Sequence, residues 1–426
     1  MGWMVMELKE RNQLNESDFV KRHGLETCNQ EIRNNKKAQV IYMDNAATTY
    51  PKPECMYKAM DFANRCQSFN AGRGSYELAQ MAMEEVDVLR SEILSFINGQ
   101  GAAEVVLTPS ATISFNQIIG GITLSRRDRV YVSPFEHNAV MRTLWMHQQK
   151  CGFMIRELPL NVDCLEIDLE KMEYQFRQDP PDYVFLSHIS NVTGYLLPVE
   201  EICAKAKELT DGQAIVVLDA AQSFGIAQID FKRMGFDMVV FAGHKTLYGP
   251  FGAAGFVKRN TFQLTPYLAG GTGSNSLQLQ MPEETSGGLE PGSLNLPAIA
   301  GLHASMKYLK EVTRKKMEEH EKRLTDKLIE ELEKIPLLRV YKAKDEKRRR
   351  GIVSFVVEGF QSGEIGMILD EEYGIEVRTG YHCAPLIHKY LEDELYGGTV
   401  RVSVGWFNKE EDVEKIVECV REIVEG

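Results

Sequence analysis

The sequence predicts an α/β protein built around a mostly parallel sheet, and two observations support that prediction. From Val40 to about residue 260, short β-rich runs alternate with longer stretches of helical period, which is the pattern of strands joined by crossover helices. At 426 residues the chain also exceeds the usual size of a single hydrophobic core. We therefore expect a large unit with a sheet flanked by helices and a second, smaller α+β unit.

Five short runs rich in β-branched and aromatic residues are expected to form the central strands. They are Glu104 to Leu107, Arg129 to Ser133, Tyr183 to Leu186, Ala214 to Leu218 and Met238 to Phe241. Helical spacing between such runs predicts a helix from Ser75 to Ile97, closed by Asn98 and Gly99, and another from Pro198 to Leu209.

The second half of the chain begins with a stretch rich in Gly, Ser and Thr, from Gly270 to Ser293. A loop of that length in a compact protein is usually functional, so we expect it to line a site. A long helical pattern from about Pro297 to Glu333 then leads to runs at Leu337 to Tyr341 and Gly351 to Val357. A last helix is predicted from about Lys409 to Val424.

These patterns suggest a division of the chain into four parts. Residues 1–39 mix charged and polar residues with little periodicity and are expected to be an N-terminal extension. Residues 40–60 would pack with the small domain. Residues 61–296 would form the large domain, and residues 297–426 the small C-terminal domain.

Composition limits the classes of partner and the location. The 49 Lys and Arg residues against 61 Asp and Glu residues give a net charge of −12, which disfavours nonspecific binding to nucleic acid or to an anionic membrane. No apolar run reaches the roughly eighteen residues that a membrane span needs, so a cytoplasmic location is expected. The eight cysteines form no C-x-x-C pair, which argues against a disulfide framework and against a metal site.

Polar residues follow each of the five predicted strands. They are Thr108 to Thr112, Glu136 to Asn138, Ser187 to Asn191, Asp219 with Gln222, and His244 with Lys245. Because ligands bind beyond the carboxyl ends of parallel strands, we expect these residues to meet at one edge of the sheet. Taken singly, Asp219 is more simply explained as a helix cap, His137 as a structural histidine and Lys245 as a surface charge.

Together these residues satisfy the requirements of a pyridoxal phosphate site. Such a site needs a lysine for the Schiff base, a carboxylate at the pyridinium nitrogen and an anion cradle for the phosphate. Lys245 and Asp219 meet the first two needs, and the segment from Thr108 to Thr112 precedes a predicted helix whose N-terminus can bind phosphate. The segment from Gly243 to Thr246 does not fit a nucleotide P-loop, which has a Gly five residues before the Gly-Lys and no His between them.

Ten short motifs occur in order between about Ile41 and Asn408. They are DNAATT at 44–49, TPSAT at 108–112, EHN at 136–138, SNVTG at 190–194, DAAQS at 219–223, GHKTLYGPFG at 243–252, GGTGS at 270–274, EPGS at 290–293, RTGYHCAP at 378–385 and RVSVGWFN at 401–408. In this order they resemble the cysteine desulfurase and selenocysteine lyase branch of the class V aminotransferases. The resemblance implies fold type I, a large domain that binds pyridoxal 5′-phosphate, and a homodimer.

The resemblance also implies roles for individual residues. Lys245 would carry the cofactor and later move the α-proton of the substrate, while His137 would stack on the cofactor ring. Asp219 would keep the pyridinium nitrogen protonated, and Gln222 would hydrogen-bond the ring oxygen.

The resemblance also implies contacts to the phosphate of the cofactor and to the carboxylate of the substrate. Phosphate contacts are implied for Ala111, Thr112, His244 and, across a homodimer interface, Thr272. Asn191 and Arg401 would orient the carboxylate of the substrate. Relatives usually carry a Ser where this chain has Ala242, so we expect one phosphate hydrogen bond fewer.

The RTGYHCAP segment resembles the flexible catalytic loop of desulfurases. In that loop a cysteine attacks the sulfur of the bound substrate and becomes a persulfide while alanine is released. Arg378, Gly380 and His382 supply positive charge and a mobile backbone around Cys383, as a thiolate nucleophile requires. A buried structural thiol is the alternative interpretation of Cys383. Tyr381 stands where relatives commonly have a His.

We therefore expect a cysteine desulfurase that acts on L-cysteine and delivers persulfide sulfur to an acceptor protein. Selenocysteine lyase, acting on L-selenocysteine, is the runner-up, and replacing Cys383 by Ala would separate the two because selenium elimination depends less on the loop cysteine. A class V aminotransferase and a noncatalytic scaffold are further alternatives. Detection of a keto acid product would favour the aminotransferase, and absence of bound cofactor would favour the scaffold.

Overall fold

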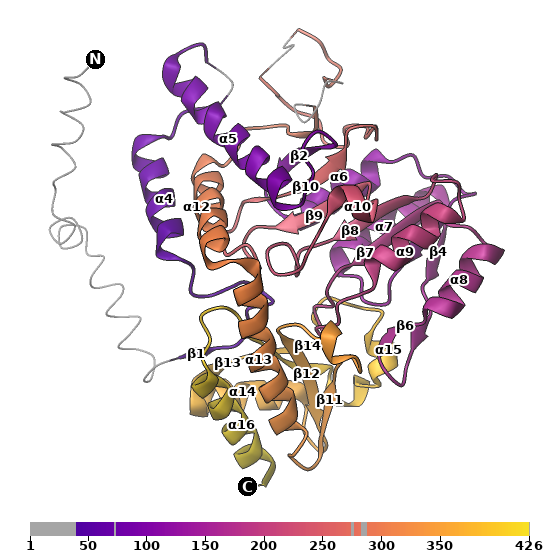
Figure 1. Cartoon of the computed structure of the whole chain (residues 1–426), viewed down its shortest axis with the longest axis vertical. Helices are drawn as coiled ribbons and strands as arrows, with labels where there is room; N and C mark the ends of the chain where they lie inside the picture. Colours follow the sequence, from indigo (N-terminus) through magenta and orange to yellow (C-terminus); the bar gives the residue numbers. More distant parts are fainter. Residues whose placement is uncertain (1–39, 72–73, 274–276, 283–287, 426) are drawn as a thin grey trace, which may run out of the picture.

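The computed structural model of the chain describes residues 40–71, 74–273, 277–282 and 288–425. The predicted N-terminal extension, residues 1–39, lies outside the described residues. Figure 1 shows a large sheet flanked by helices in the upper part of the molecule and a smaller sheet with its own helices in the lower part, where the C-terminus lies.

The central sheet has seven strands in the order β2-β10-β9-β8-β7-β3-β4. Their bounds are β2 (Ala103–Thr108), β3 (Arg129–Val132), β4 (Met154–Glu157), β7 (Tyr183–Ser187), β8 (Ile215–Asp219), β9 (Met238–Ala242) and β10 (Ala254–Arg259). Strand β10 pairs antiparallel with β9 and β2, whereas the other neighbouring strands pair in parallel. The predicted mostly parallel sheet is therefore confirmed, with β4 and β10 added to the five expected strands.

Both faces of the central sheet are covered by helices. Along β2, Val105 and Leu107 join a buried cluster with α5 and α9, while Val106 between them faces a second cluster with α6 and α7. The flanking helices are α5 (Glu77–Phe96), α6 (Ala111–Gly121), α7 (Asn138–Cys151), α8 (Leu169–Gln178), α9 (Val199–Glu208) and the short α10 (Phe231–Met234). Side chains alternate between the two faces of a strand, so strands buried on both faces are apolar at nearly every position.

The smaller sheet is antiparallel, in the order β11-β12-β15-β14. Its strands are β11 (Leu338–Tyr341), β12 (Ile352–Val357), β14 (Arg378–Gly380) and β15 (Thr399–Ser403). Helices α13 (Arg314–Leu332), α14 (Ser362–Tyr373) and α16 (Glu410–Glu425) share a buried cluster with one face of this sheet. The remaining short elements are α15 (His388–Leu391), η1 (Glu346–Arg348), η2 (Glu394–Tyr396) and the paired β5 (Leu160–Asn161) and β6 (Glu166–Ile167).

The helical pattern expected over residues 297–333 forms two helices, α12 (Leu296–Val312) and α13. They meet at Thr313, whose φ of 71° lies in the left-handed region that β-branched residues rarely adopt. Helix α12 lies against α4 (Glu54–Cys66) on the large unit, and α13 continues toward the small unit (Figure 1). Within the described residues, no helix is long and apolar enough to cross a membrane.

The segment before α4 joins the small unit. Strand β1 (Ile41–Tyr42) pairs in parallel with β13 (Ile375–Glu376), and Asp44 forms an isolated bridge with Ser403 of β15. The exact limits of the four predicted parts stay a prediction. What matters for the site is that residues 41–49 run from the small sheet toward the carboxyl ends of the large sheet.

Candidate active site

A cavity of about 200 Å³ lies beyond the carboxyl ends of the parallel strands. Most of the predicted site residues line it: Ala111, Thr112, His137, Asn191, Asp219, Gln222, His244, Lys245 and Arg401. The small sheet contributes Arg378 as well as Arg401, and the segment before α4 contributes Ala46 and Ala47. The structure thus brings together the polar residues that follow all five predicted strands.

The turn that carries Lys245 follows β9 and is held by the segment before α4. The carbonyl oxygen of His244 accepts hydrogen bonds from the Thr48 hydroxyl (2.9 Å), the Thr49 backbone N–H (3.2 Å) and the Lys52 ammonium (2.7 Å). The Thr49 hydroxyl also donates to the carbonyl oxygen of Lys245 at 3.0 Å. These bonds fix the backbone from which the Lys245 side chain enters the cavity.

The environment of Lys245 favours its neutral amine. Burial lowers its pKa most; the nearby Asp219 carboxylate opposes this shift, and the Arg401 guanidinium adds to it. A neutral lysine amine can act as a nucleophile toward an aldehyde and can accept a proton. The surroundings of Lys245 therefore shift its equilibrium toward the neutral amine.

Asp219 ends strand β8 and is almost completely buried. Its carboxylate accepts a hydrogen bond from the Ala221 backbone N–H at 2.9 Å. Burial raises its pKa, while that hydrogen bond and the charge of Lys245 lower it. A buried carboxylate in this position is suited to pair with a buried cation such as a protonated ring nitrogen. Nearby, the Gln222 amide donates to the Ala46 carbonyl at 2.7 Å, which fixes its orientation.

His137 occupies the N-cap position of helix α7. Its Nδ1 accepts a hydrogen bond from the Ala139 backbone N–H at 3.0 Å, so a neutral ring carries its proton on Nε2. Burial, followed by the charge of Lys245, lowers its pKa to about 3. The cavity wall therefore contains a neutral, flat imidazole whose orientation is set by the helix.

The N-terminus of α6 and the ring of His244 form an anion cradle. Helix α6 begins at Ala111, and the first N–H groups of a helix have no partner within the helix and attract anions. The buried Nδ1 of His244 has no hydrogen-bond partner among the described residues. A phosphate group bound here would satisfy both. Thr272 is half-buried and does not line this cavity, and its predicted contact across a subunit interface stays a prediction.

Two arginines face the cavity from the small sheet. Arg378 and Arg401 lie directly opposite each other on β14 and β15, and Arg401 alternates with Val400 and Val402, which face the core of the small unit. Arg401 forms an ion pair with Asp44 at 2.6 Å. Within the described residues Arg378 has no ion pair with a carboxylate. Like charges directly opposite each other are destabilising, so this pair favours binding of an additional anion, such as a substrate carboxylate.

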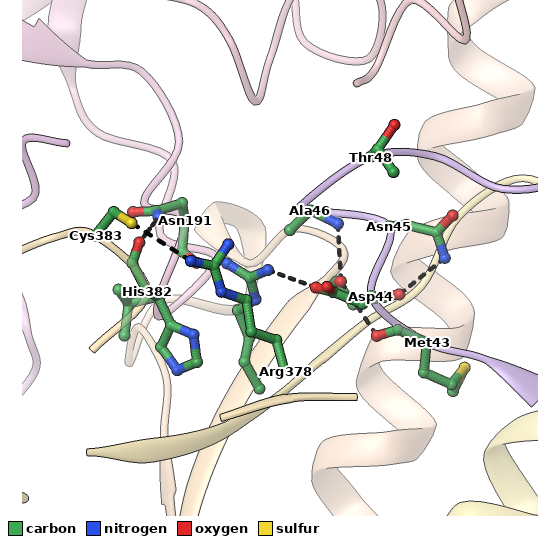
Figure 2. Close-up of polar contacts among 12 residues, drawn as sticks. Met43, Asp44, Asn45, Ala46, Thr48, Asn191, Arg378, His382 and Cys383 are labelled. Atoms are coloured by element: carbon green, nitrogen blue, oxygen red, sulfur yellow. Dashed lines mark hydrogen bonds and ion pairs between the residues drawn. The ribbon is translucent and has the colours of Figure 1, made fainter. Parts of the chain in front are cut away.

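Cys383 lies on the loop after β14, beside the cavity. Its sulfur accepts a hydrogen bond from the Arg378 guanidinium at 3.4 Å, as Figure 2 shows. Arg378 lines the first cavity and also a second cavity of about 670 Å³, which Cys383 lines too. Asn191, which was expected to orient a substrate carboxylate, donates its amide N–H to the His382 carbonyl at 2.7 Å and so also supports this loop.

Comparison with known proteins identifies the family. The family model Aminotransferase class-V matches residues 41–416. The chain belongs to this family.

Curated relatives and solved structures are similar to this chain over almost their whole length. A probable cysteine desulfurase of Aeropyrum pernix is 32% identical over 403 residues, covering 90% of this chain and 94% of the relative. One of Methanothermobacter thermautotrophicus is 30% identical over 388 residues, with the same coverage of 90% and 94%. The apo structure of a cysteine desulfurase from Thermococcus onnurineus NA1 superposes with a TM-score of 0.83 at 30% identity, covering 91% of this chain and 95% of that structure. The fold type I architecture is therefore confirmed.

Sequence reasoning did not single out three charged residues of this class V site. Asp44 heads the DNAATT motif and neutralises Arg401, and Lys52 donates to the turn before Lys245. Glu136 is completely buried beside the site, where its Oε1 accepts hydrogen bonds from the Ser133 hydroxyl and the Ser187 N–H. Burial raises the pKa of Glu136 to about 8, so the carboxyl group is protonated at neutral pH. Asp44 and Glu136 lie inside ordered motifs, and Glu136 also follows a predicted strand, whereas Lys52 lies outside every motif and had no such signal.

Proposed function

We propose that this protein is a pyridoxal phosphate-dependent cysteine desulfurase, which converts L-cysteine to L-alanine and keeps the sulfur on Cys383 as a persulfide. One observation carries the proposal. A half-buried lysine, a buried carboxylate and a neutral histidine line a single cavity, and an arginine of that cavity contacts the sulfur of Cys383. An aminotransferase has no need for a cysteine at that place.

The residues present fit the cofactor. The phosphate would bind at the N–H groups of Ala111 and Thr112 and at the unpartnered Nδ1 of His244. The remaining contacts would be Lys245 at the aldehyde, Asp219 at the ring nitrogen, Gln222 at the ring oxygen and His137 on the ring face. The bound cofactor would supply an electron sink for the electrons released at the α-carbon of the substrate.

The substrate carboxylate would bind at Arg401, which Asp44 and the Asn191 carbonyl hold in place, with Arg378 opposite. This places the α-carbon toward Lys245, whose neutral amine would take up the α-proton. Because Lys245 and Arg401 come from different sheets, both sheets must be in place for the reaction.

Cys383 would act as the nucleophile of the sulfur transfer. Its sulfur would form a bond to the substrate sulfur as the carbon–sulfur bond of the substrate breaks, so that Cys383 becomes a persulfide and alanine leaves. We propose that an acceptor protein then takes the sulfur in the second cavity, which reaches the exposed residues Arg142 and Tyr381.

A homodimer is part of the proposal. Phe251 is 65% exposed although it stacks on His244 at a ring separation of 4.6 Å. Helices α4 and α5 also expose large apolar side chains: Tyr57, Phe62, Leu78, Met81 and Val88. A second subunit covering these residues would lie beside the phosphate cradle, where Thr272 of that subunit is expected to reach it. Sedimentation of the purified protein as a monomer at micromolar concentration would contradict this part.

The function is tested by incubating the protein with L-cysteine and with L-selenocysteine separately and measuring alanine and the released sulfide or selenide. Alanine with sulfide from cysteine is the expected result. Lys245→Ala should lose the visible absorbance of the bound cofactor and both activities. Cys383→Ala should lose sulfur release from cysteine, whereas Cys151→Ala, which changes another half-buried thiol, should retain it.

Three results would require another function. Full cysteine activity in Cys383→Ala would remove the role proposed for this residue. Release of selenide without any sulfide from the native protein would indicate a selenocysteine lyase, and formation of a keto acid would indicate an aminotransferase. Absence of visible absorbance after addition of the cofactor would indicate a noncatalytic scaffold.

A further inference from the structure

Three successive backbone carbonyl groups of the Cys383 loop are held by donors from three different parts of the chain. The carbonyl oxygens belong to Tyr381, His382 and Cys383. Their donors from outside the loop are a ring nitrogen of His388 at 2.9 Å, the Asn191 amide at 2.7 Å and the Asn138 backbone N–H at 2.7 Å, respectively. Within the loop, the Tyr381 carbonyl also accepts the Ala384 backbone N–H at 3.0 Å. The loop is therefore fixed along its whole tip, although Tyr381 is 47% exposed.

These hydrogen bonds support an unfavourable backbone. The φ angles of His382 and Cys383 are 46° and 59°, so two consecutive side-chain-bearing residues lie in the left-handed region. Such conformations persist only where the surrounding structure imposes them. Losing one of the three donors would allow the loop to relax toward ordinary backbone angles and move the Cys383 sulfur away from Arg378.

His388 is the one titratable side chain among these donors, and it is itself held by a buried carboxylate. Its Nδ1 lies 2.6 Å from Oδ2 of Asp393, whose side chain is only 1% exposed. The other ring nitrogen faces the Tyr381 carbonyl, which can only accept a hydrogen bond. Both ring nitrogens therefore face hydrogen-bond acceptors. Within the described residues, Asp393 Oδ1 has no hydrogen-bond partner, so His388 provides the side-chain hydrogen bond of this buried carboxylate.

The groups around His388 hold its ring against the loop and leave neither ring nitrogen free for a substrate. The Tyr381 ring packs edge-on against its ring at 5.1 Å, and the ring of His382 lies 6.1 Å away. Its neighbours in α15 point elsewhere, since Lys389 and Tyr390 both bind Glu157 of β4. Both ring nitrogens of His388 are used by protein groups, so the ring is not available for proton transfer with a substrate.

We propose that His388, oriented by Asp393, is a positioning residue that keeps the Cys383 loop in its strained conformation through the Tyr381 carbonyl. The inference deepens the proposed function, because it assumes that this conformation presents Cys383 to the substrate sulfur. It places the His388 and Asp393 pair directly behind the Cys383 loop.

The test measures the loop directly, in the cofactor-loaded protein without substrate. Backbone hydrogen exchange is followed for the peptide containing Asn138, whose N–H binds the Cys383 carbonyl, and the alkylation rate of Cys383 by iodoacetamide is followed by mass spectrometry. Leaving a buried polar group without its hydrogen-bond partner shifts a local opening equilibrium by roughly fivefold to a hundredfold. His388→Leu should therefore raise both rates at least about fivefold.

Two further variants distinguish positioning from general damage. His388→Gln retains an N–H that can reach the Tyr381 carbonyl, and it should bring both rates closer to native than His388→Leu does. Tyr390→Phe removes a hydrogen bond that the same short helix makes to Glu157 and not to the Cys383 loop. This variant should leave both rates unchanged. If His388→Leu fails to fold because Asp393 is left unpaired, the double variant with His388→Leu and Asp393→Leu is measured instead of the single variant. The double variant also removes the unpaired carboxylate.

Turnover of cysteine provides the second readout. His388→Leu should lower kcat at least about tenfold with KM for cysteine unchanged, because the carboxylate site at Arg401 is not altered. Native exchange and alkylation rates in folded His388→Leu would overturn the inference. If exchange and alkylation respond as expected but the native protein releases no sulfur from cysteine, the inference about the loop stands and the proposed function fails.

Discussion

The ion pair between Asp44 and Arg401 offers a quantitative test of how the site is held together. Arg401 has a side-chain exposure of 1% and lies opposite Arg378, and Asp44 is the carboxylate with which it forms an ion pair. Asp44→Asn removes that negative charge and keeps the shape and one oxygen acceptor. Two guanidinium groups would then face each other across β14 and β15 without the neutralising charge.

The expected loss of stability follows from this geometry. Removing one partner of a buried ion pair costs about 3–5 kcal/mol, and the hydrogen bond that Asn can still accept recovers about 1 kcal/mol. We therefore expect a loss of about 2–4 kcal/mol in the free energy of unfolding. With an unfolding entropy of roughly 2.1 cal/mol/K per residue, the 426 residues give about 0.9 kcal/mol/K, so Tm should fall by about 2–4 °C.

Thermal unfolding of the native protein and of Asp44→Asn at low ionic strength measures this difference. Asp61→Asn is the matched control, because Asp61 pairs with Arg65 at a similar distance of 2.8 Å on the exposed surface of α4, where such a pair is worth at most about 1 kcal/mol. Equal Tm values for Asp44→Asn and the control would refute the argument that Asp44 compensates two opposed arginines.

Three further predictions concern buried residues of the site. Burial raises the pKa of the Glu136 carboxyl from its ordinary 4.5 to about 8, so the free energy of unfolding of the native protein falls as pH rises between these values. Glu136→Gln should remove this fall. Relative to the native protein, its free energy of unfolding in denaturant titrations should therefore increase by about 3–5 kcal/mol between pH 5 and pH 8. His137→Ala should be less stable than His137→Asn by about 1 kcal/mol, since Asn can still accept the Ala139 N–H at the N-cap, while both variants retain cofactor more weakly in equilibrium dialysis. Gly243→Ala should lower the free energy of unfolding by more than about 2 kcal/mol and weaken cofactor binding as well, because the added Cβ would lie 2.3 Å from the Ala253 carbonyl oxygen. A melting curve like that of the native protein would contradict this prediction.

The sequence was informative for the fold wherever strands are buried on both faces. The runs that became β7, β8 and β9 are almost entirely apolar and were recognised within a residue or two of their limits. Strand β4, with Arg156 and Glu157 at the sheet edge, and β10, which contains Gly255 and Lys258, have mixed composition and were not recognised. Periodicity could also not reveal the break at Thr313, because both helices continue the same apolar spacing.

The sequence predicted that side chains following the strands would meet in one place, as they do in the cavity, but it did not reveal the side chains that act through tertiary contacts. His137, Asp219 and Lys245 could be placed because the carboxyl ends of parallel strands must meet. The roles of Asp44 and Glu136 depend on which residue lies opposite them in space, and no local spacing encodes that. His388 likewise meets the Cys383 loop only because η2 and α15 bring Asp393 behind it.

The DNAATT segment explains how one site can be built from two separate sheets. Asp44 binds Arg401 of the small sheet, while Thr49, five residues later, binds the turn of Lys245 on the large sheet. Between them, the Ala46 N–H donates a hydrogen bond to the Ser403 hydroxyl of the small sheet, and the Ala46 carbonyl accepts one from the Gln222 amide of the large unit. Small residues are required here because Ala46 and Ala47 line the cavity itself. A shift of this segment would therefore move Arg401 and Lys245 together, which would couple the proposed carboxylate site to the lysine proposed to carry the cofactor.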